Sequence, residues 1–121
     1  MNSILNSVKL KLGLSDDYDA FDYELIGDIN SAFFVLWQLG VGRHPERPFT
    51  IQGGMEEWSD FVDDGDIDIC KTYVAMRVRL LFDPPSNSFL VENINKQIQE
   101  FEQRMVYTVD ARNAGKTGGV A

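Results

Sequence analysis

The stretch Tyr73–Phe89, YVAMRVRLLFDPPSNSF, decides how this chain folds. Its first part has apolar residues at helical spacing, and the helix must end near Phe82-Asp83 because two prolines follow. Proline has no amide hydrogen for a helix interior, and it disfavours the helical conformation of the residue before it. A second helical pattern starts almost at once. Phe82, Asp83, Pro84 and Pro85 therefore predict a stiff structural corner between two helices, with no pattern of a nucleophile, a general base or metal ligands.

The helix that ends at this corner has apolar residues on two sides of a helical wheel. One side carries Ile67, Cys70, Val74, Val78 and Leu81, and the other carries Ile69, Tyr73, Met76 and Leu80. Such a helix is either central in its own domain or shared with another molecule. The next helix, about Ser88 to Tyr107, has one narrow apolar arc, formed by Leu90, Val91, Ile94, Ile98, Phe101 and Met105. We expect this arc to cover one side of the preceding helix.

Two more helices are predicted before this region. Residues 4–12 form a short amphipathic segment that ends at Gly13. Ser15–Asp17 offer N-cap chemistry for a second helix, which runs to about Leu39, where Gly40 is a stop signal. The expected inner face of the second helix consists of Leu25, Ile29, Ala32, Phe33 and Leu36. This second helix is expected to cover the remaining side of the two-sided helix.

A long irregular connection, Val41–Gly54, follows the second helix and contains prolines and glycines. Loops of this length inside a small domain tend to be functional or disordered, and we expect this one to project and to contact a partner, such as a neighbouring copy. Within it, Phe49–Ile51 could form one short strand. Met55–Val62 predicts a short helical turn, and Asp66 is the expected N-cap of the two-sided helix. The fold class is therefore an all-α bundle of four main helices with a long loop between the second and the third.

The length of 121 residues suits one domain with its own core. The longest apolar run, Ala32–Trp37, is far too short to span a membrane, and Met1–Ser3 shows no basic region of a signal peptide. The single cysteine, Cys70, excludes an internal disulfide and fits a reducing compartment. We expect one helical domain over 1–107, followed by a polar, glycine-rich and flexible tail over 108–121.

The formal net charge of −8 is unevenly distributed. Residues 1–68 carry four Lys/Arg and fourteen Asp/Glu, a net −10, whereas residues 69–121 carry seven and five, a net +2. An acidic domain gains nothing from counterion release on DNA, which argues against sequence-reading nucleic-acid binding. The asymmetry suits head-to-tail contact between copies, although the acids could equally serve only to keep the domain soluble.

Two motif-like patterns lack the rest of their sites. Gly115–Thr117 resembles the end of a phosphate-binding loop, but Asp110 stands where the first glycine is needed, and no helix follows. Asp64, Asp66 and Asp68 have the alternate spacing of a calcium loop, but neither the required glycine nor the bidentate acid is present. We expect these acids to cap a helix instead.

No catalytic, cofactor-binding or metal-binding residue is predicted. His44 is the only histidine, which excludes a multi-histidine metal site, and Cys70 on an apolar stripe is expected to be an inert core residue. Glu56 and Glu57 are adjacent, so on a helix they point apart. An enzyme with a site assembled between subunits, using Asp60, Asp63 or Glu57, remains an alternative that we rank last.

Three runs carry a resemblance to a known family: Tyr73-Val74, Arg79–Pro85 (RLLFDPP) and Ile98–Arg104 (IQEFEQR). Together they resemble the head–tail connector (adaptor) family of long-tailed bacteriophages. The LLFDPP run is the most specific of them. The short first helix, the Asp-rich turn and the longer second helix are similar to that family as well, so the resemblance covers roughly residues 3–107.

The resemblance implies a structural virion protein that is not an enzyme. Such a protein forms a homo-oligomeric ring, with a dodecamer among the options, beneath the portal of the DNA-filled capsid. The ring joins head to tail, extends the DNA channel and offers a platform for the next head-completion or tail protein. DNA would pass through it without specific binding, and assembly would take place in the bacterial host cytoplasm, away from any membrane. No cofactor is implied. A different helical interaction module, such as a regulator or an antitoxin-like protein, would share the helix pattern and remains the alternative.

Aromatic and basic side chains outside the expected core are candidates for the interface with copies or partners. Tyr23 also lies outside the inner arc of the second helix. The candidate interface residues are Phe34, Trp37, Arg43, Arg47, Phe49, Arg77, Arg79, Arg112 and Lys116.

Overall fold

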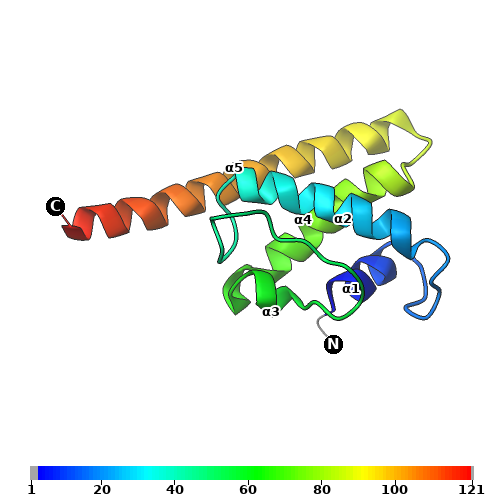
Figure 1. Cartoon of the computed structure of the whole chain (residues 1–121). Coiled ribbons are helices and arrows are strands. Elements are labelled where there is room, and N and C mark those ends of the chain that lie inside the picture. The colour runs from blue at the N-terminus through cyan, green and yellow to red at the C-terminus, as the bar shows by residue number, and fades with distance from the viewer. Residues whose placement is uncertain (1–2, 121) are drawn as a thin grey trace.

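The computed structural model describes residues 3–120, and it describes side chains as far as Arg112. Five helices follow one another along the chain, as Figure 1 shows: α1 (Ile4–Lys11), α2 (Asp22–Gln38), α3 (Trp58–Phe61), α4 (Asp64–Phe82) and α5 (Ser88–Val120). Residues 3–120 contain no strand, only an isolated bridge between Ser3 and Glu57. The predicted all-α bundle is confirmed.

Helix α4 lies at the centre of the fold and contacts each of the other four helices. Helix α2 packs on one side of α4 and α5 on another. Helices α1 and α3 also pack against α4, at the lower side of the bundle in the view of Figure 1. All five residues predicted for the inner face of α2 are fully buried: Leu25, Ile29, Ala32, Phe33 and Leu36. Helix α4 therefore lies centrally within its own domain. This is one of the two options predicted from its two-sided apolar pattern.

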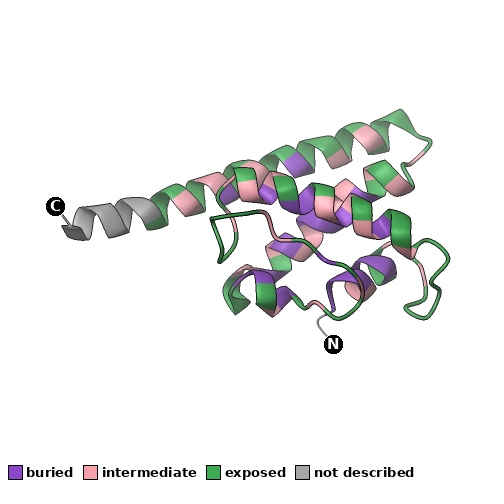
Figure 2. Cartoon of the chain, in the orientation of Figure 1, coloured by how far each residue is buried: buried purple, intermediate pink, exposed green. Residues whose placement is uncertain are grey.

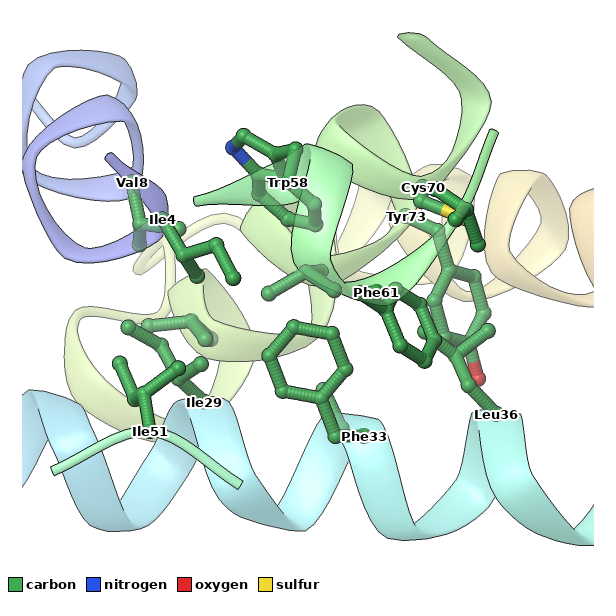
Figure 3. Packing of buried hydrophobic residues seen from close by; sticks show 14 of the residues in the cluster. Ile4, Val8, Ile29, Phe33, Leu36, Ile51, Trp58, Phe61, Cys70 and Tyr73 are labelled. Carbon is green, nitrogen blue, oxygen red and sulfur yellow. The ribbon is translucent and has the colours of Figure 1, made fainter. Parts of the chain in front are cut away.

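An aromatic cluster fills the space between α2, α3 and the long connection. The ring of Phe33 lies 4.6 Å from that of Phe61, 5.2 Å from that of Phe49 and 5.9 Å from that of Trp58. Figure 3 shows Phe33 reaching up from α2 toward Phe61 and Trp58. Edge-to-face pairs of this kind stabilise a core beyond the area that they bury.

The connection from Val41 to Gly54 lies against the body of the protein rather than projecting. Asn30 on α2 holds it: the Ile51 amide donates to Asn30 Oδ1 at 2.8 Å, and Asn30 Nδ2 donates to the Ile51 carbonyl at 3.0 Å. Ile51 is buried next to Ile29 (Figure 3). The short strand expected over Phe49–Ile51 does not form, because a side chain of α2 satisfies the backbone groups that a neighbouring strand would have paired.

Two glycines fix the start of this connection. Gly40 has a φ of 85°, the left-handed conformation that commonly ends a helix, and it follows α2 as predicted. Gly42 has a φ of 121°, and a Cβ at that position would lie 2.8 Å from the Phe61 ring. The turn therefore needs a glycine there for both its backbone conformation and its space.

The predicted starts of α2 and α4 are wrong by several residues. Helix α2 begins at Asp22 after Phe21, so Ser15–Asp17 lie in the preceding turn and do not cap it. Helix α4 begins at Asp64 rather than after Asp66. In both cases an Asp-rich stretch offers several competing start positions, and tertiary contacts select one of them. Lys9 helps to select the first, because its buried ammonium group lies 2.9 Å from Asp22 Oδ1 and donates to the Asp16 carbonyl at 3.1 Å.

Helix α5 begins at Ser88 as predicted but does not end near Tyr107, since it runs to Val120. Among residues 108–112, Val109 packs close to Gly40, and Arg112 binds Asp66 on α4. These contacts belong to the folded domain. The last helix therefore does not end at the expected boundary between residues 107 and 108. The flexibility predicted for the rest of the tail falls on 113–121, outside the residues whose side chains are described, and it stays a prediction.

Candidate functional site

The predicted corner joins the last turn of α4 to the first turn of α5. Asp83 is the residue that follows α4, and its amide donates to the Arg79 carbonyl at 2.9 Å. Phe82 packs edge-to-face on Phe21 of the α1–α2 turn, with the ring centres 5.2 Å apart. Pro84 is exposed and Pro85 is half-buried. The corner is thus attached to the body through Phe82, while its prolines face outward.

Three exposed apolar side chains flank this corner. The exposed fraction is 74 % for Phe89, 58 % for Leu81 and 51 % for Leu90. We call these three residues the corner knob. In the apolar arc predicted for α5, only Ile98 and Met105 are buried, while Val91, Ile94 and Phe101 are half-buried and Leu90 is exposed. The exposed corner is visible in Figure 2, at the end of the α4–α5 pair opposite the C-terminus.

A pocket of about 420 Å³ lies at the other end of the α4–α5 pair. Its floor contains the buried side chains of Val62, Cys70 and Met105, and Thr108 and Val109 of α5 form one wall. We call this hollow the α5 pocket. Its lining is completed by Gly40, Val41, Gly42, Arg43, Pro45, Asp63, Asp66, Ile69 and Arg112.

Two ion pairs frame the α5 pocket. Arg43 Nη2 lies 3.1 Å from Asp63 Oδ1, and Arg112 contacts Asp66 through both of its terminal nitrogens, at 3.0 and 3.1 Å. Arg43 also donates to the Val62 carbonyl, at 3.3 Å. The hydrogen bonds that Arg112 donates to Asp66 raise the pKa of Arg112 further above its usual range, so this guanidinium stays charged. The rim is therefore fixed by internal contacts before any partner binds.

A polar link joins the middle of α4 to α5. The Tyr73 hydroxyl donates to Glu102 Oε2 at 2.7 Å, and Arg77 Nη1 lies 3.3 Å from the same oxygen. The Arg77 guanidinium also stacks 5.8 Å from the centre of the Tyr73 ring. Burial, and then the bond to Glu102, raise the pKa of Tyr73 well above its ordinary value, so the hydroxyl remains a donor. Arg77, a candidate interface residue, thus takes part in a contact within the chain.

The candidates Phe34 and Trp37 lie at the outer side of α2. Phe34 is exposed, and Trp37 is half-buried with its ring 5.6 Å from that of Phe34. Trp37 Nε1 donates to the Pro45 carbonyl at 2.9 Å, which ties the long connection to α2. Phe34 remains available to a partner. Trp37 supports the loop and presents only part of its ring.

The remaining candidates have different surroundings. Phe49 packs into the aromatic cluster and Arg43 is paired at the α5 pocket, whereas Arg47 and Arg79 are exposed. Within the described side chains, neither Arg47 nor Arg79 has an acidic group within 4 Å. Arg112 lies at the pocket rim, and the side chain of Lys116 lies outside the described residues. The structure therefore spreads these candidates over several surfaces rather than bringing them together.

The chemically reactive side chains are isolated. Burial, with a smaller effect of Asp66, raises the pKa of the Cys70 thiol to about 12, so the reactive thiolate is scarce at neutral pH. His44 is exposed beside Glu46, with 3.5 Å between Nδ1 and Oε1. Within the described part of the chain, no three His, Cys, Asp or Glu side chains are grouped to hold a metal ion.

Among the described residues, no helix is long and apolar enough to cross a bilayer.

Sequence reasoning missed the corner knob as a surface. It assigned Leu90 to a covered arc and did not single out Phe89. The signal was present in part: Asn87 is a good N-cap, so an aromatic residue two positions later lies in the first helical turn, next to the corner. The α5 pocket could not be read from the sequence, because its walls come from segments far apart in the chain.

In the comparison with protein families, residues 4–112 match the family described as "Phage connector protein". The matched span includes α1 to α4 and the part of α5 whose side chains are described. Comparisons with curated proteins and with solved structures give no match.

Proposed function

The chain belongs to the phage connector protein family, and from this membership we propose that it forms a ring at the portal vertex that joins the phage head to the tail and extends the DNA channel. Family membership makes it a structural component of the virion. The observation that carries the proposal is the extent of the match, residues 4–112, which takes in every contact described between the helices.

The distribution of apolar surface supports assembly through unlike surfaces. Helix α4 is enclosed by α1, α2, α3 and α5 along most of its length, so it is not the shared helix that its two-sided pattern also allowed. Exposed apolar side chains lie instead at the corner knob and at scattered positions elsewhere, among them Leu10, Tyr18, Tyr23, Phe34, Met55 and Tyr107. A ring needs one surface on each copy to meet a different surface on the next copy. The corner knob and the α5 pocket are two such different surfaces.

The acidic surface supports a role beside DNA without binding to it. Asp16, Asp17 and Asp19 are exposed in the α1–α2 turn, and Glu24 is exposed on the first turn of α2. Burial, and then the neighbouring Glu24, raise the pKa of Asp28 one turn further along α2. A channel lined by such a surface would repel a polyanion and let it slide. We propose that this part of the protein faces the channel.

The partners in this proposal are further copies of the chain, the portal protein and the next head-completion or tail protein. The C-terminal end of α5 is the proposed element for docking on the portal or on a neighbouring copy. Assembly on the portal would couple ring formation to completion of the head, since a surface that is weakly self-associating in solution can be organised by a template.

A conditional knockout tests the function directly. In the phage that encodes this chain, a nonsense mutation should yield DNA-filled heads and separate tails by electron microscopy, and expression of the chain in trans should restore complete particles. A nonsense mutant that still produces tailed, infectious particles would show that the chain does not join head to tail. A mutant that fails to make filled heads at all would place the protein at an earlier step and contradict the proposal.

A further inference from the structure

The corner knob is an exposed apolar feature carried on a capped helical backbone. The Phe89 amide donates to Asn87 Oδ1 at 2.8 Å, and the amides of Leu90 and Val91 donate to the Asn87 carbonyl. The first turn of α5 is therefore capped, and Pro84-Pro85 restrict the chain before it. A backbone segment that is already ordered loses little conformational entropy when a partner covers it. The knob side chains stand on such a backbone, which an apolar residue on a mobile loop would lack.

The α5 pocket has the complementary properties. Its floor is apolar, its volume of about 420 Å³ accommodates a phenyl ring together with a leucine side chain, and its charged rim residues are neutralised by each other. An occupant with an apolar end therefore fits better than a small charged ligand, which would find no unpaired buried group of opposite sign. Among the surfaces described, the corner knob offers an aromatic and two aliphatic side chains of this kind.

The knob cannot reach the pocket of its own chain. At a rise of 1.5 Å per helical residue, Thr108 in the pocket wall lies about 27 Å along α5 from Leu90. Along α4, Ile69 in the lining lies about 18 Å from Leu81. The corner lies at one end of the helix pair (Figure 2), and the pocket is lined by residues near the other end, such as Asp66 and Arg112. They can meet only between two molecules.

We propose that the corner knob of one copy inserts into the α5 pocket of the next copy and that this contact joins successive subunits. The inference deepens the ring proposed above and rests on it, by naming the two surfaces that pair. Contact between unlike surfaces is head-to-tail, and it closes into a ring when the rotation per copy divides a full turn.

Charge around the two surfaces favours the same arrangement. Arg79 near the knob is exposed and has no acidic neighbour within 4 Å among the described residues. Asp64, next to the pocket rim, is exposed and has no basic neighbour within 4 Å among those residues. Opposite charges at the edge of an apolar contact select the partner and its orientation. The knob belongs to the half of the chain with net charge +2, and most of the acids at the rim belong to the half with −10.

Cysteine crosslinking distinguishes this pairing from others. Phe89→Cys and Thr108→Cys are prepared as separate proteins, mixed in equal amounts, assembled alone or on the portal protein of the same phage, and oxidised. Both variants also carry Cys70→Ala, because Cys70 lines the α5 pocket and could itself form a disulfide with either introduced cysteine. We expect a disulfide-linked dimer in the mixture, little dimer from either variant alone, and a ladder of oligomers from the double variant.

Each other outcome overturns the pairing. Dimers from Phe89→Cys alone would show that two knobs meet about a two-fold axis. Rings without a crosslink in the mixture would show that copies meet through other surfaces, and the proposed function would stand. If the wild-type chain forms no ring either alone or on the portal, the proposed function and this inference both fail.

A complementation experiment gives an independent readout. Phe89→Asp removes the knob and leaves the pocket intact, and aspartate suits the first turn of a helix, so the fold should be retained. Thr108→Arg obstructs the pocket and leaves the knob intact. We expect neither variant to form rings and their mixture to stop at one-to-one dimers in mass photometry. Met55→Asp, at a residue that is 90 % exposed and neither belongs to the corner knob nor lines the α5 pocket, serves as the matched control and should assemble like the wild type. Normal rings from Phe89→Asp would refute the inference.

Discussion

Arg112 of α5 donates two hydrogen bonds to Asp66 of α4, from Nη1 to Oδ2 at 3.0 Å and from Nη2 to Oδ1 at 3.1 Å. The two residues are 46 positions apart, and their contact fastens the C-terminal half of α5 to the first turn of α4. This pair also closes one side of the α5 pocket. It shows that the folded domain extends beyond the sequence-based boundary at residue 107.

Loss of this ion pair should have a small effect on stability. Arg112→Gln should lower the free energy of unfolding by at most about 1 kcal/mol, because exposed ion pairs are screened by water and salt. The effect should shrink in high salt. Urea unfolding at low and high salt measures both quantities. Arg47→Gln is the control, since that exposed arginine has no described acidic neighbour. An equal loss in both variants would mean that the Arg112–Asp66 contact contributes nothing.

Loss of the Asn30 side chain should be more damaging. Asn30→Ala removes both hydrogen bonds to the buried backbone of Ile51, and we expect a loss of about 1–3 kcal/mol because buried polar groups are left without partners. Thermal or urea unfolding gives the value. Asn95→Ala, at an exposed position of α5, should be close to neutral. An Asn30→Ala protein as stable as the wild type would show that the long connection is not anchored at this point.

The raised pKa of Asp28 predicts a specific pH dependence. Between the ordinary value of 3.8 and the raised value, the folded state holds a proton that the unfolded state has released, so this group makes stability fall as pH rises through that range. At neutral pH the folded protein therefore carries an unfavourable carboxylate. Asp28→Asn should unfold at higher urea concentration than the wild type at pH 7, and the difference should shrink as pH falls through this range. A variant that is less stable than the wild type at pH 7 would contradict the sign.

Two truncations separate the folded part of α5 from the proposed docking element. A chain ending at Tyr107 loses Val109 and Arg112 and should unfold at lower temperature, because both side chains contact the body. A chain ending at Arg112 keeps these contacts and should melt close to the full-length protein. We expect both to bind the portal less well than the full chain. If the chain ending at Arg112 binds the portal normally, the C-terminal end of α5 has no part in docking.

The sequence predicted the end of α4 and the buried face of α2 well because both follow from local rules, whereas only Ile98 and Met105 of the arc predicted for α5 are buried. The double proline located the end of α4, and the 3.6-residue period of Leu25, Ile29 and Leu36 located the buried face of α2. These features depend on backbone chemistry and on side chains of the same helix. Asp-rich stretches were less informative, because several aspartates in a row offer equivalent caps and only the tertiary contacts of Lys9 and Phe21 select the start of α2.

Features built from distant segments could not be predicted. The clamp from Asn30 to Ile51 and the Tyr73–Glu102 hydrogen bond join residues 21 and 29 positions apart, with no pattern that pairs them in sequence. The interface candidates were chosen by residue type, and residue type does not tell whether an arginine has a partner within its own chain. Arg77 has one, whereas Arg79 has none among the described side chains.

The most direct test of the account is a cryo-electron microscopy reconstruction of the chain bound to the portal protein of the same phage. The account predicts a closed ring coaxial with the portal, with the α1–α2 turn facing the channel and Phe89 of each copy seated against Thr108 of the next. Single copies scattered on the portal, or no bound density, would contradict it.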